Sequence, residues 1–190
     1  MFVIREATEK DADPIFDLIC FKAEFDGCFS SVQATPRKLI VAMRGTSPYF
    51  RALLAEADNK PIGFASFHQT FSSFLAQPGI WLDDLFVRES HRGHGVGSAL
   101  MRRLAVLADR NGCARIDWMV ATSNITARGF YTHIGSRVNE GVRHCRLDAD
   151  AIARLAKDAA AGAISRTFMS SPQPESERRS LGGQSATVLD

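Results

Sequence analysis

The segment Arg92-Gly93-His94-Gly95-Val96-Gly97 constrains the fold of this chain most strongly, because it joins a hydrophobic stretch to an amphipathic one. Ile80 to Val87, directly before it, is apolar enough to form a buried strand. The apolar residues after it recur at helical spacing: Val96, Ala99, Leu100, Leu104, Leu107 and Ala108. Glycines in such a turn let successive backbone N–H groups point at one anion. The pattern therefore predicts a phosphate or pyrophosphate site at the start of a helix, with Arg92 beside it.

Two common glycine-rich phosphate loops do not fit this segment. A dinucleotide-binding loop needs G-x-G-x-x-G near the first strand, whereas here the third glycine is missing and the loop lies in the middle of the chain. A Walker loop carries a lysine after its last glycine, and this segment has none. A tight turn that binds nothing is the alternative to a phosphate site.

The surrounding sequence predicts alternating strands and helices. Strands are expected at Phe2–Arg5, Tyr49–Ala57, Ile62–Thr70, Ile80–Val87, Arg115–Ala121 and Arg143–Leu147. Helices are expected from Thr8 or Asp13, from Pro36 to Gly45, from Val96 to Asn111, from Ile125 to His133 and from Asp150 to Ala161. Asp58-Asn59-Lys60-Pro61 predicts an antiparallel hairpin, and Gln77-Pro78-Gly79 is expected to form the next turn.

The length and composition predict one folded domain and a tail. The chain has 190 residues, of which 45% are hydrophobic, which is enough for a sizeable core. We expect residues 1–164 to form a single domain. Residues 165–190 are rich in Ser, Pro, Gly, Gln and Arg without periodicity, so we expect a disordered tail.

Charge and cysteine content bear on partners and compartment. Lys and Arg total 23 and Asp and Glu 21, a net charge of +2, which argues against a dedicated nucleic-acid binder. No apolar run approaches the roughly 20 residues that span a bilayer, and the N-terminus lacks the apolar centre of a secretory signal. The four cysteines form no CxxC pair, so we expect reduced thiols and a cytoplasmic protein.

Two stretches resemble the GNAT N-acetyltransferase superfamily. WLDDLFVRESHRGHGVGSALMRRL resembles its motif A, whose R/Q-x-x-G-x-G/A pattern is met by Arg92, Gly95 and Gly97. SNITARGFYTHIGSRV resembles its motif B, with Asn124 and the pair Phe130-Tyr131 in place. FVIREAT, PGIWLDDLFV and RLDADAIARLA are similar to the diamine (spermidine/spermine-type) N-acetyltransferases.

This resemblance implies a single α/β (α+β) domain, in which a mixed, twisted sheet flanked by helices is splayed open to admit acetyl-coenzyme A. In such proteins the pantetheine arm of acetyl-coenzyme A pairs with the strand that here holds Leu85, Phe86 and Val87. The other cofactor contacts that it implies are Arg92, Gly93, His94, Gly95, Val96, Gly97, Ser98, Asn124, Ile125, Thr126 and Ala127.

The resemblance also suggests which residues perform the chemistry. Attack on a thioester needs a neutral amine, but a free alkylamine has a pKa of about 10. The glutamate that serves as base in diamine acetyltransferases aligns with Asp83, which is one methylene shorter and favours contact through water. Tyr131 falls at the position of the general acid that protonates the leaving thiolate. A backbone N–H near Phe86 or Val87 is expected to stabilise the developing oxyanion.

Acceptor recognition is expected at Phe25 and Asp26, where diamine acetyltransferases have a Tyr-Glu pair, together with Asp83. Glu24 is a possible substitute for Asp26. We expect direct transfer to a primary amine of a small molecule, a di- or polyamine or a lysine-like amine, without a covalent acyl-enzyme and without a metal. The alternatives are another acceptor, such as an antibiotic, an amino acid or a protein N-terminus, and a non-catalytic acetyl-coenzyme A sensor. A homodimer is expected by analogy.

Overall fold

The computed structural model describes residues 1–160, and the chain divides into two units, of which the first ends at Arg137 and the second begins at Val138. The first unit holds a five-stranded sheet with the strand order β1-β2-β3-β4-β5. The strands are β1 (Val3–Glu6), β2 (Arg51–Ala57), β3 (Lys60–Ser72), β4 (Gln77–Val87) and β5 (Ile116–Asp117). Neighbouring strands run antiparallel except β4 and β5, which are parallel, so the predicted mixed sheet is confirmed.

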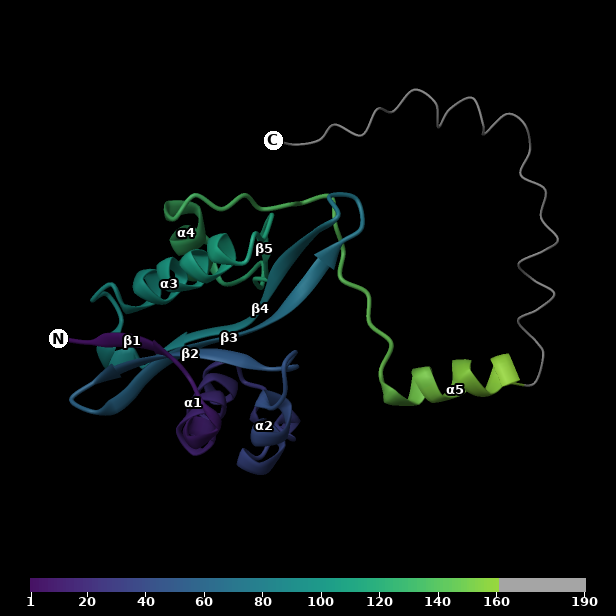
Figure 1. Ribbon diagram of the computed structural model, residues 1–190, viewed down its shortest axis with the longest axis horizontal. Helices are drawn as coiled ribbons and strands as arrows, with labels where there is room; N and C mark the ends of the chain where they lie inside the picture. The colour runs from purple at the N-terminus through teal and green to yellow at the C-terminus, as the bar shows by residue number, and fades with distance from the viewer. Residues whose placement is uncertain (161–190) are drawn as a thin grey trace, which may run out of the picture. The chain divides into compact units, whose positions relative to one another are not determined.

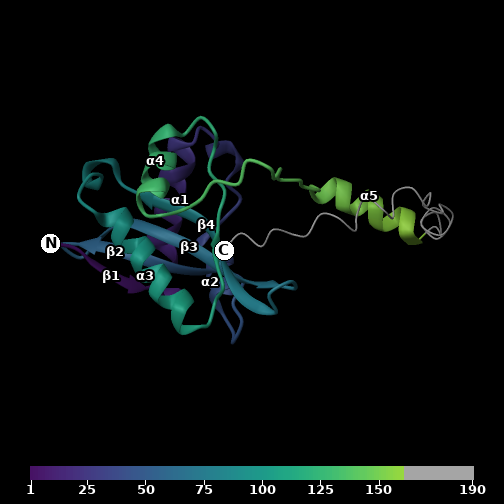
Figure 2. The same cartoon turned by 90° about the horizontal axis from the view of Figure 1, so that it is seen from above.

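Helices cover both faces of this sheet (Figures 1 and 2). The helices α1 (Ala12–Phe25) and α2 (Pro36–Met43) lie on one face, and α3 (Val96–Arg110) lies on the other. The shorter helix α4 (Ile125–His133) follows β5. The two layers of helices bury both faces of the central strands, which explains why β2 and β3 are apolar along most of their length.

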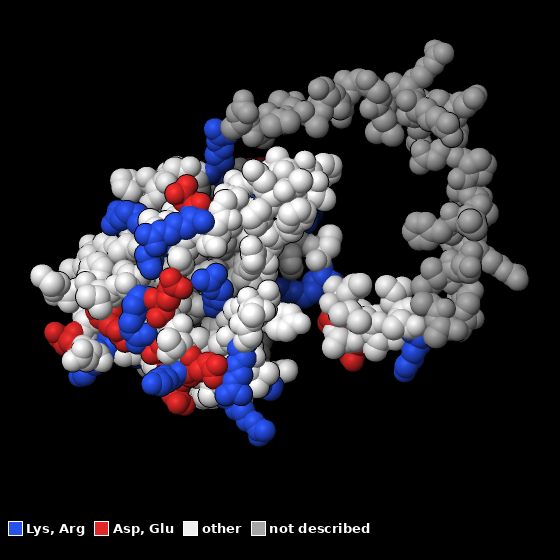
Figure 3. All heavy atoms as spheres, viewed as in Figure 1, with Lys and Arg blue, Asp and Glu red and all other residues white. Residues whose placement is uncertain are grey.

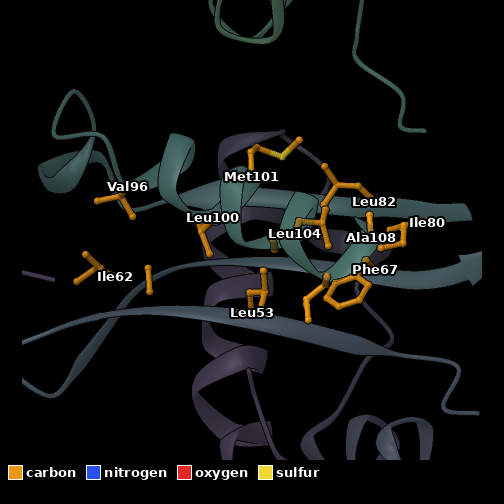
Figure 4. Close-up of a cluster of buried hydrophobic side chains, with 13 residues drawn as sticks. Leu53, Ile62, Phe67, Ile80, Leu82, Val96, Leu100, Met101, Leu104 and Ala108 are labelled. Carbon is orange, nitrogen blue, oxygen red and sulfur yellow. The ribbon is translucent and has the colours of Figure 1, made fainter. Parts of the chain in front are cut away.

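The predicted apolar stripe of α3 forms the larger core cluster (Figure 4). Leu100 and Leu104 are fully buried between α3 and the sheet, against Leu53 of β2 and Phe67 of β3. The opposite cluster contains Ile15 and Leu18 of α1, which are also fully buried. Burying a side chain of this size contributes about 1.5–3 kcal/mol, so each helix is fixed to its face by several such residues.

The start of α1 is tied to the sheet by an ionic network. Thr8 and Asp11 form a capping box, in which the Thr8 N–H donates to Asp11 at 2.7 Å. Arg5 of β1 donates to both carboxylate oxygens of Asp11, at 2.7 and 2.9 Å, and also to Glu56 of β2. Pro14 is accommodated in the first turn of α1.

The turn expected at Gln77-Pro78-Gly79 is wrong, because these three residues are the first residues of β4. The chain turns earlier, over residues 73–76, where Ala76 has a φ of 50°. Gly79 instead permits close backbone packing: a Cβ there would lie 2.9 Å from Thr70 Oγ1. The Pro78 carbonyl accepts from Ala114 N–H at 2.9 Å, so the residue joins the sheet through its acceptor.

Two expected strands are shorter or absent. The strand predicted over Arg115–Ala121 pairs with β4 only at Ile116 and Asp117, and its remainder diverges from β4. Arg143–Leu147 forms no strand within the described residues, since this polar segment is exposed and has no pairing partner there. In the second unit, α5 (Ala149–Ala160) confirms the predicted last helix as far as Ala160. The boundary at 164 and the tail lie outside the described residues.

Candidate active site

A wide cleft in the first unit lies where β4 loses its pairing with β5. The two strands are joined only at Ile80 and Trp81, and beyond this point the edge of β4 is open. The cleft has a volume of about 1260 Å³ and is lined by residues from α1, β4, the glycine loop, the segment after β5 and α4. The gap is the splay expected from the sequence, and it explains why residues 118–121 form no strand.

Leu85 and Val87 direct their backbone groups toward this open edge. The Arg88 N–H donates to the Ile62 carbonyl at 2.8 Å, and Phe86 lies opposite Phe64 in the same antiparallel register. Antiparallel pairs alternate between bonded and non-bonded residues, so the residues flanking Phe86 face away from β3. The cleft is therefore bordered by a strand edge that can pair with an extended ligand.

The glycine loop forms one end of the cleft. Gly93 and Gly95 have φ values of 77° and 79°, which favour glycine, and a Cβ at either position would meet no atom within 4 Å. Gly95 is the N-cap of α3, and no side chain within the described residues caps this helix. The first N–H groups of an uncapped helix are available to an anion. The loop thus has the open geometry and backbone donors that a phosphate requires.

Arg92 joins the glycine loop to the end of α1. Its guanidinium lies 4.3 Å from the ring centroid of Phe25, and its Nε donates to the Val87 carbonyl at 2.9 Å. Both contacts bring Arg92 and Phe25, two predicted site residues, to the same side of the cleft.

The segment around α4 forms the opposite wall. Asn124 caps α4, since its side-chain oxygen accepts from the Ala127 N–H at 3.0 Å. Thr126 and Ala127 line the cleft as expected, whereas Ile125 points to solvent with 69% of its surface exposed. His94 is also not among the residues that line the cleft, and its Nδ1 is hydrogen-bonded to the Arg92 carbonyl at 2.8 Å. The structure therefore does not bring His94 and Ile125 to the cleft.

Tyr131 of α4 lines the cleft and is largely buried. It is 9% exposed and packs against Trp118, with 4.9 Å between ring centroids, and against Phe130 at 5.2 Å. Burial raises the pKa of Tyr131, and the positive charge of Lys22 offsets part of this effect. The hydroxyl therefore stays protonated through the neutral range, as a proton donor must.

Asp83 occupies a bulge in β4. In the backbone register, Ser66 pairs with Asp84 and Phe67 pairs with Leu82, so Asp83 has no residue opposite it on β3. Its carboxylate lies 2.9 Å from His68 Nδ1, and it lines the cleft. Asp83 is therefore paired with an imidazole ring rather than with a fixed positive charge.

Lys22 of α1 is partly buried beside the acceptor residues expected from the sequence. Its ammonium forms ion pairs with Asp26, at the end of α1, and with Asp84 of β4 at 3.3 Å. Asp84 also accepts from the Ser66 hydroxyl at 2.9 Å. Burial lowers the pKa of Lys22, but the hydrogen bond to Asp26 and the charge of Asp84 outweigh it and raise the pKa. Lys22 is therefore a fixed positive charge in the cleft.

Sequence reasoning missed three of these residues. Lys22 follows the apolar stripe of Ile15 and Leu18 at helical spacing, which was a signal that it points toward the sheet. His68 could be found only from the β3–β4 register, and Trp118 only from the divergence of β5 from β4.

Other candidates lie away from this chemistry. Cys113 does not line the cleft, and burial raises the pKa of its thiol, which disfavours the nucleophilic thiolate. Within residues 1–160 no group of three or more His, Cys, Asp or Glu side chains is arranged to hold a metal ion.

Comparison with known proteins identifies relatives of this chain. L-ornithine N5-acetyltransferase NATA1 of Arabidopsis thaliana is 37% identical over 95 residues, 50% of this chain and 42% of that enzyme, so the match covers less than half of its length. Thialysine N-epsilon-acetyltransferase of Bos taurus is 27% identical over 165 residues, 81% of this chain and 96% of that enzyme.

A solved structure and a family model also match this chain. An integron cassette protein from the mobile metagenome of V. cholerae superposes with a TM-score of 0.67 and 25% identity, covering 82% of this chain and 98% of that one. The model of the acetyltransferase (GNAT) family matches residues 18–135, which include β4, the glycine loop and Tyr131. The predicted fold, family and N-acetyltransferase activity are confirmed. The chain belongs to the acetyltransferase (GNAT) family, whose acetyl donor is acetyl-coenzyme A.

Proposed function

We propose that this N-acetyltransferase acetylates the primary amine of a small molecule, a di- or polyamine or a lysine-like amine. The observation that carries the proposal is one cleft that contains an open strand edge, an uncapped helix start, Asp83 and Tyr131. Ornithine and thialysine, which appear in the names of two relatives, both carry a side-chain amine, and this supports the same acceptor class here.

Acetyl-coenzyme A fits the two open features of the cleft. The backbone groups of Leu85 and Val87 would hold its extended arm, and the N–H groups from Gly93 to Ser98 would hold its phosphates. Bound there, it supplies an acetyl group activated as a thioester. The side chains around it then have to prepare the amine and to protonate the leaving sulfur.

Asp83 is the proposed proton acceptor for the amine. An alkylammonium ion must lose a proton before its nitrogen can form the new C–N bond. Asp83 takes this proton directly or through water, and His68, which is 2.9 Å away and half-exposed, relays it toward solvent. This route needs no covalent acyl-enzyme.

Tyr131 is the proposed proton donor. As the C–S bond breaks, the Tyr131 hydroxyl gives its proton to the sulfur, and burial keeps the hydroxyl protonated until then. The Val87 N–H, which faces the open edge, is placed to stabilise negative charge on the acetyl oxygen.

A non-catalytic acetyl-coenzyme A sensor would need neither Asp83 nor Tyr131. The experiment is a screen of primary amines with acetyl-coenzyme A, followed by release of the free thiol. Diamines, lysine-like amino acids, aminoglycosides and a peptide N-terminus are compared at equal concentration. Acetylation of a small diamine or lysine-like amine supports the proposal, and turnover confined to aminoglycosides or the peptide would overturn it. A sensor would bind acetyl-coenzyme A in calorimetry without releasing thiol.

Compartment and assembly are also proposals. All four cysteines are free thiols, which supports a cytoplasmic protein. Within residues 1–160 no helix is long and apolar enough to cross a membrane. Acidic and basic side chains are intermixed over the face shown in Figure 3, which supports a small-molecule partner rather than nucleic acid. Phe71, Phe74 and Leu75 are exposed near the β3–β4 turn and support a homodimer, which light scattering would test.

A further inference from the structure

The cleft presents fewer free negative charges than its sequence suggests. Asp26 and Asp83 both line it and were expected to attract two cationic ends of one acceptor. The Asp26 carboxylate is instead paired with the ammonium of Lys22, which also lines the cleft. Within the described residues, Asp83 has no fixed positive partner, because His68 is charged only when it is protonated. One carboxylate is therefore left for an acceptor ammonium.

Lys22 is held in this place from two sides. Asp26 lies one helical turn further along α1, and Asp84 lies on β4, so the ammonium bridges the helix and the sheet. Asp84 is fixed in turn by the hydroxyl of the buried Ser66. Only 25% of the Lys22 side chain is exposed. An ammonium ion anchored by two carboxylates and a packed helix is a preorganised part of the cleft rather than a mobile surface charge.

We infer that Lys22 is a specificity-determining residue: its ammonium occupies the position at Asp26 and Asp84 where the second ammonium of a diamine would otherwise bind, so the enzyme disfavours di- and polyamines relative to acceptors whose far end carries no net positive charge, such as the zwitterionic end of a lysine-like amino acid. This inference rests on the proposed function and narrows its acceptor class. A second ammonium near Lys22 is repelled by its like charge, and the two carboxylates already share that one positive charge. An uncharged or anionic end meets no such repulsion.

The test compares n-butylamine with putrescine, which differ by a second amine at the far end of the same carbon chain. We expect the wild type to favour butylamine in kcat/KM. Lys22→Met leaves the two carboxylates without their partner, and we expect it to raise the putrescine-to-butylamine ratio about tenfold or more. The ratio does not depend on the fraction of folded enzyme, because both amines are assayed with the same preparation.

Two further variants separate specificity from stability. Lys22→Met combined with Asp26→Asn removes one of the unpaired carboxylates, and the ratio should return toward that of the wild type. Lys22→Gln removes the charge but keeps hydrogen-bond donors. It should raise the putrescine-to-butylamine ratio in the same way, and it replaces Lys22→Met in the test if that variant folds poorly. Lys38→Met is the control for loss of one positive charge, since Lys38 is exposed on α2 and its ammonium is bonded to the Gln33 carbonyl.

The outcomes distinguish this inference from the proposed function. An unchanged ratio in folded Lys22 variants, or a wild type that prefers putrescine, overturns the role of Lys22 while the acetyltransferase assignment to small amines stands. If the wild type and the Lys22 variants acetylate neither these amines nor any small amine of the wider screen, the proposed function and this inference both fail.

Discussion

One side of the cleft presents backbone groups, and the other side presents charged side chains. The side proposed to bind the acetyl donor, here called the donor side, consists of backbone: the edge of β4 at Leu85 and Val87, and the N–H groups at the uncapped start of α3. The acceptor side consists of side chains: Lys22, Asp26 and Asp83 with their partners. Backbone groups are present whatever the side chain, so the donor side tolerates most substitutions except at its glycines. The acceptor side can change its preference through one charged residue.

The largest effect is expected on the donor side. Gly95→Asp places a carboxylate at the helix start that is proposed to bind phosphate, and it forces a side chain into a φ of 79°. Repulsion of the phosphates should weaken acetyl-coenzyme A binding by about a hundredfold or more. Calorimetric titration measures it, and normal binding would refute the anion site.

Gly95→Ala is the matched control for this change. It introduces the same backbone strain, roughly 1–2 kcal/mol, but no charge. We expect it to lower stability while weakening acetyl-coenzyme A binding much less than Gly95→Asp does. Equal losses of binding in both variants would show that conformation rather than charge governs the donor side.

Tyr131→Phe should produce the next largest effect. Removing a general acid lowers kcat by about a hundredfold or more, while the buried ring and its contact with Trp118 remain. The KM for acetyl-coenzyme A should change little. Stopped assays of thiol release check both constants, and an unchanged kcat would remove Tyr131 as the proton donor.

Asp83→Asn should act on the acceptor side alone. It removes the proton acceptor and the free negative charge, so kcat/KM for the amine should fall by about ten- to a hundredfold. The Kd of acetyl-coenzyme A should not change. If turnover and its pH profile both survive this substitution, Asp83 is not the base.

His68→Asn tests the partner of Asp83. If His68 relays the proton, its loss should reduce kcat/KM by a smaller factor than Asp83→Asn does. The two losses should not be additive in the double variant, because both residues serve one proton path. Fully additive losses would assign His68 an independent role.

The smallest effect concerns the support of the acceptor side. The Arg5 hydrogen bonds lower the pKa of Asp11 to about 2, below its ordinary value of about 3.9. The stabilisation is therefore complete above about pH 4 and is lost as the pH falls toward 2. Asp11→Asn should cost about 1–3 kcal/mol at neutral pH. The difference in Tm from the wild type should shrink in acid; a constant difference would contradict the linkage.

The strand, the glycine turn and the helix of the donor side could be predicted from the sequence, because their signals are local. A strand, a glycine turn and an apolar stripe lie consecutively in the chain, and each leaves a periodic or compositional trace. Asp83 and Tyr131 were also located, through motifs that lie on either side of that turn.

The acceptor side could not be predicted because its partners are distant in sequence. His68 meets Asp83 across 15 positions, and Asp84 meets Lys22 across more than sixty. The prediction of a turn at Gln77-Pro78-Gly79 was wrong for a related reason. Gly79 is required by the proximity of Thr70 and Arg115, which composition does not reveal.

The bulge at Asp83 shifts the alternation of β4 side chains between the two faces of the sheet. Leu82 and Leu85 pack toward α3, and Phe86 packs toward α1, so strict alternation is broken by one residue between them. Deleting Asp83 would restore even parity and leave Asp84, Leu85 and Phe86 on the faces they now occupy. The packing of Leu82, Leu85 and Phe86 in the two core clusters therefore does not require this extra residue. Asp83 is therefore an extra residue in the strand that the hydrophobic pattern does not need, and it is the residue proposed as the base.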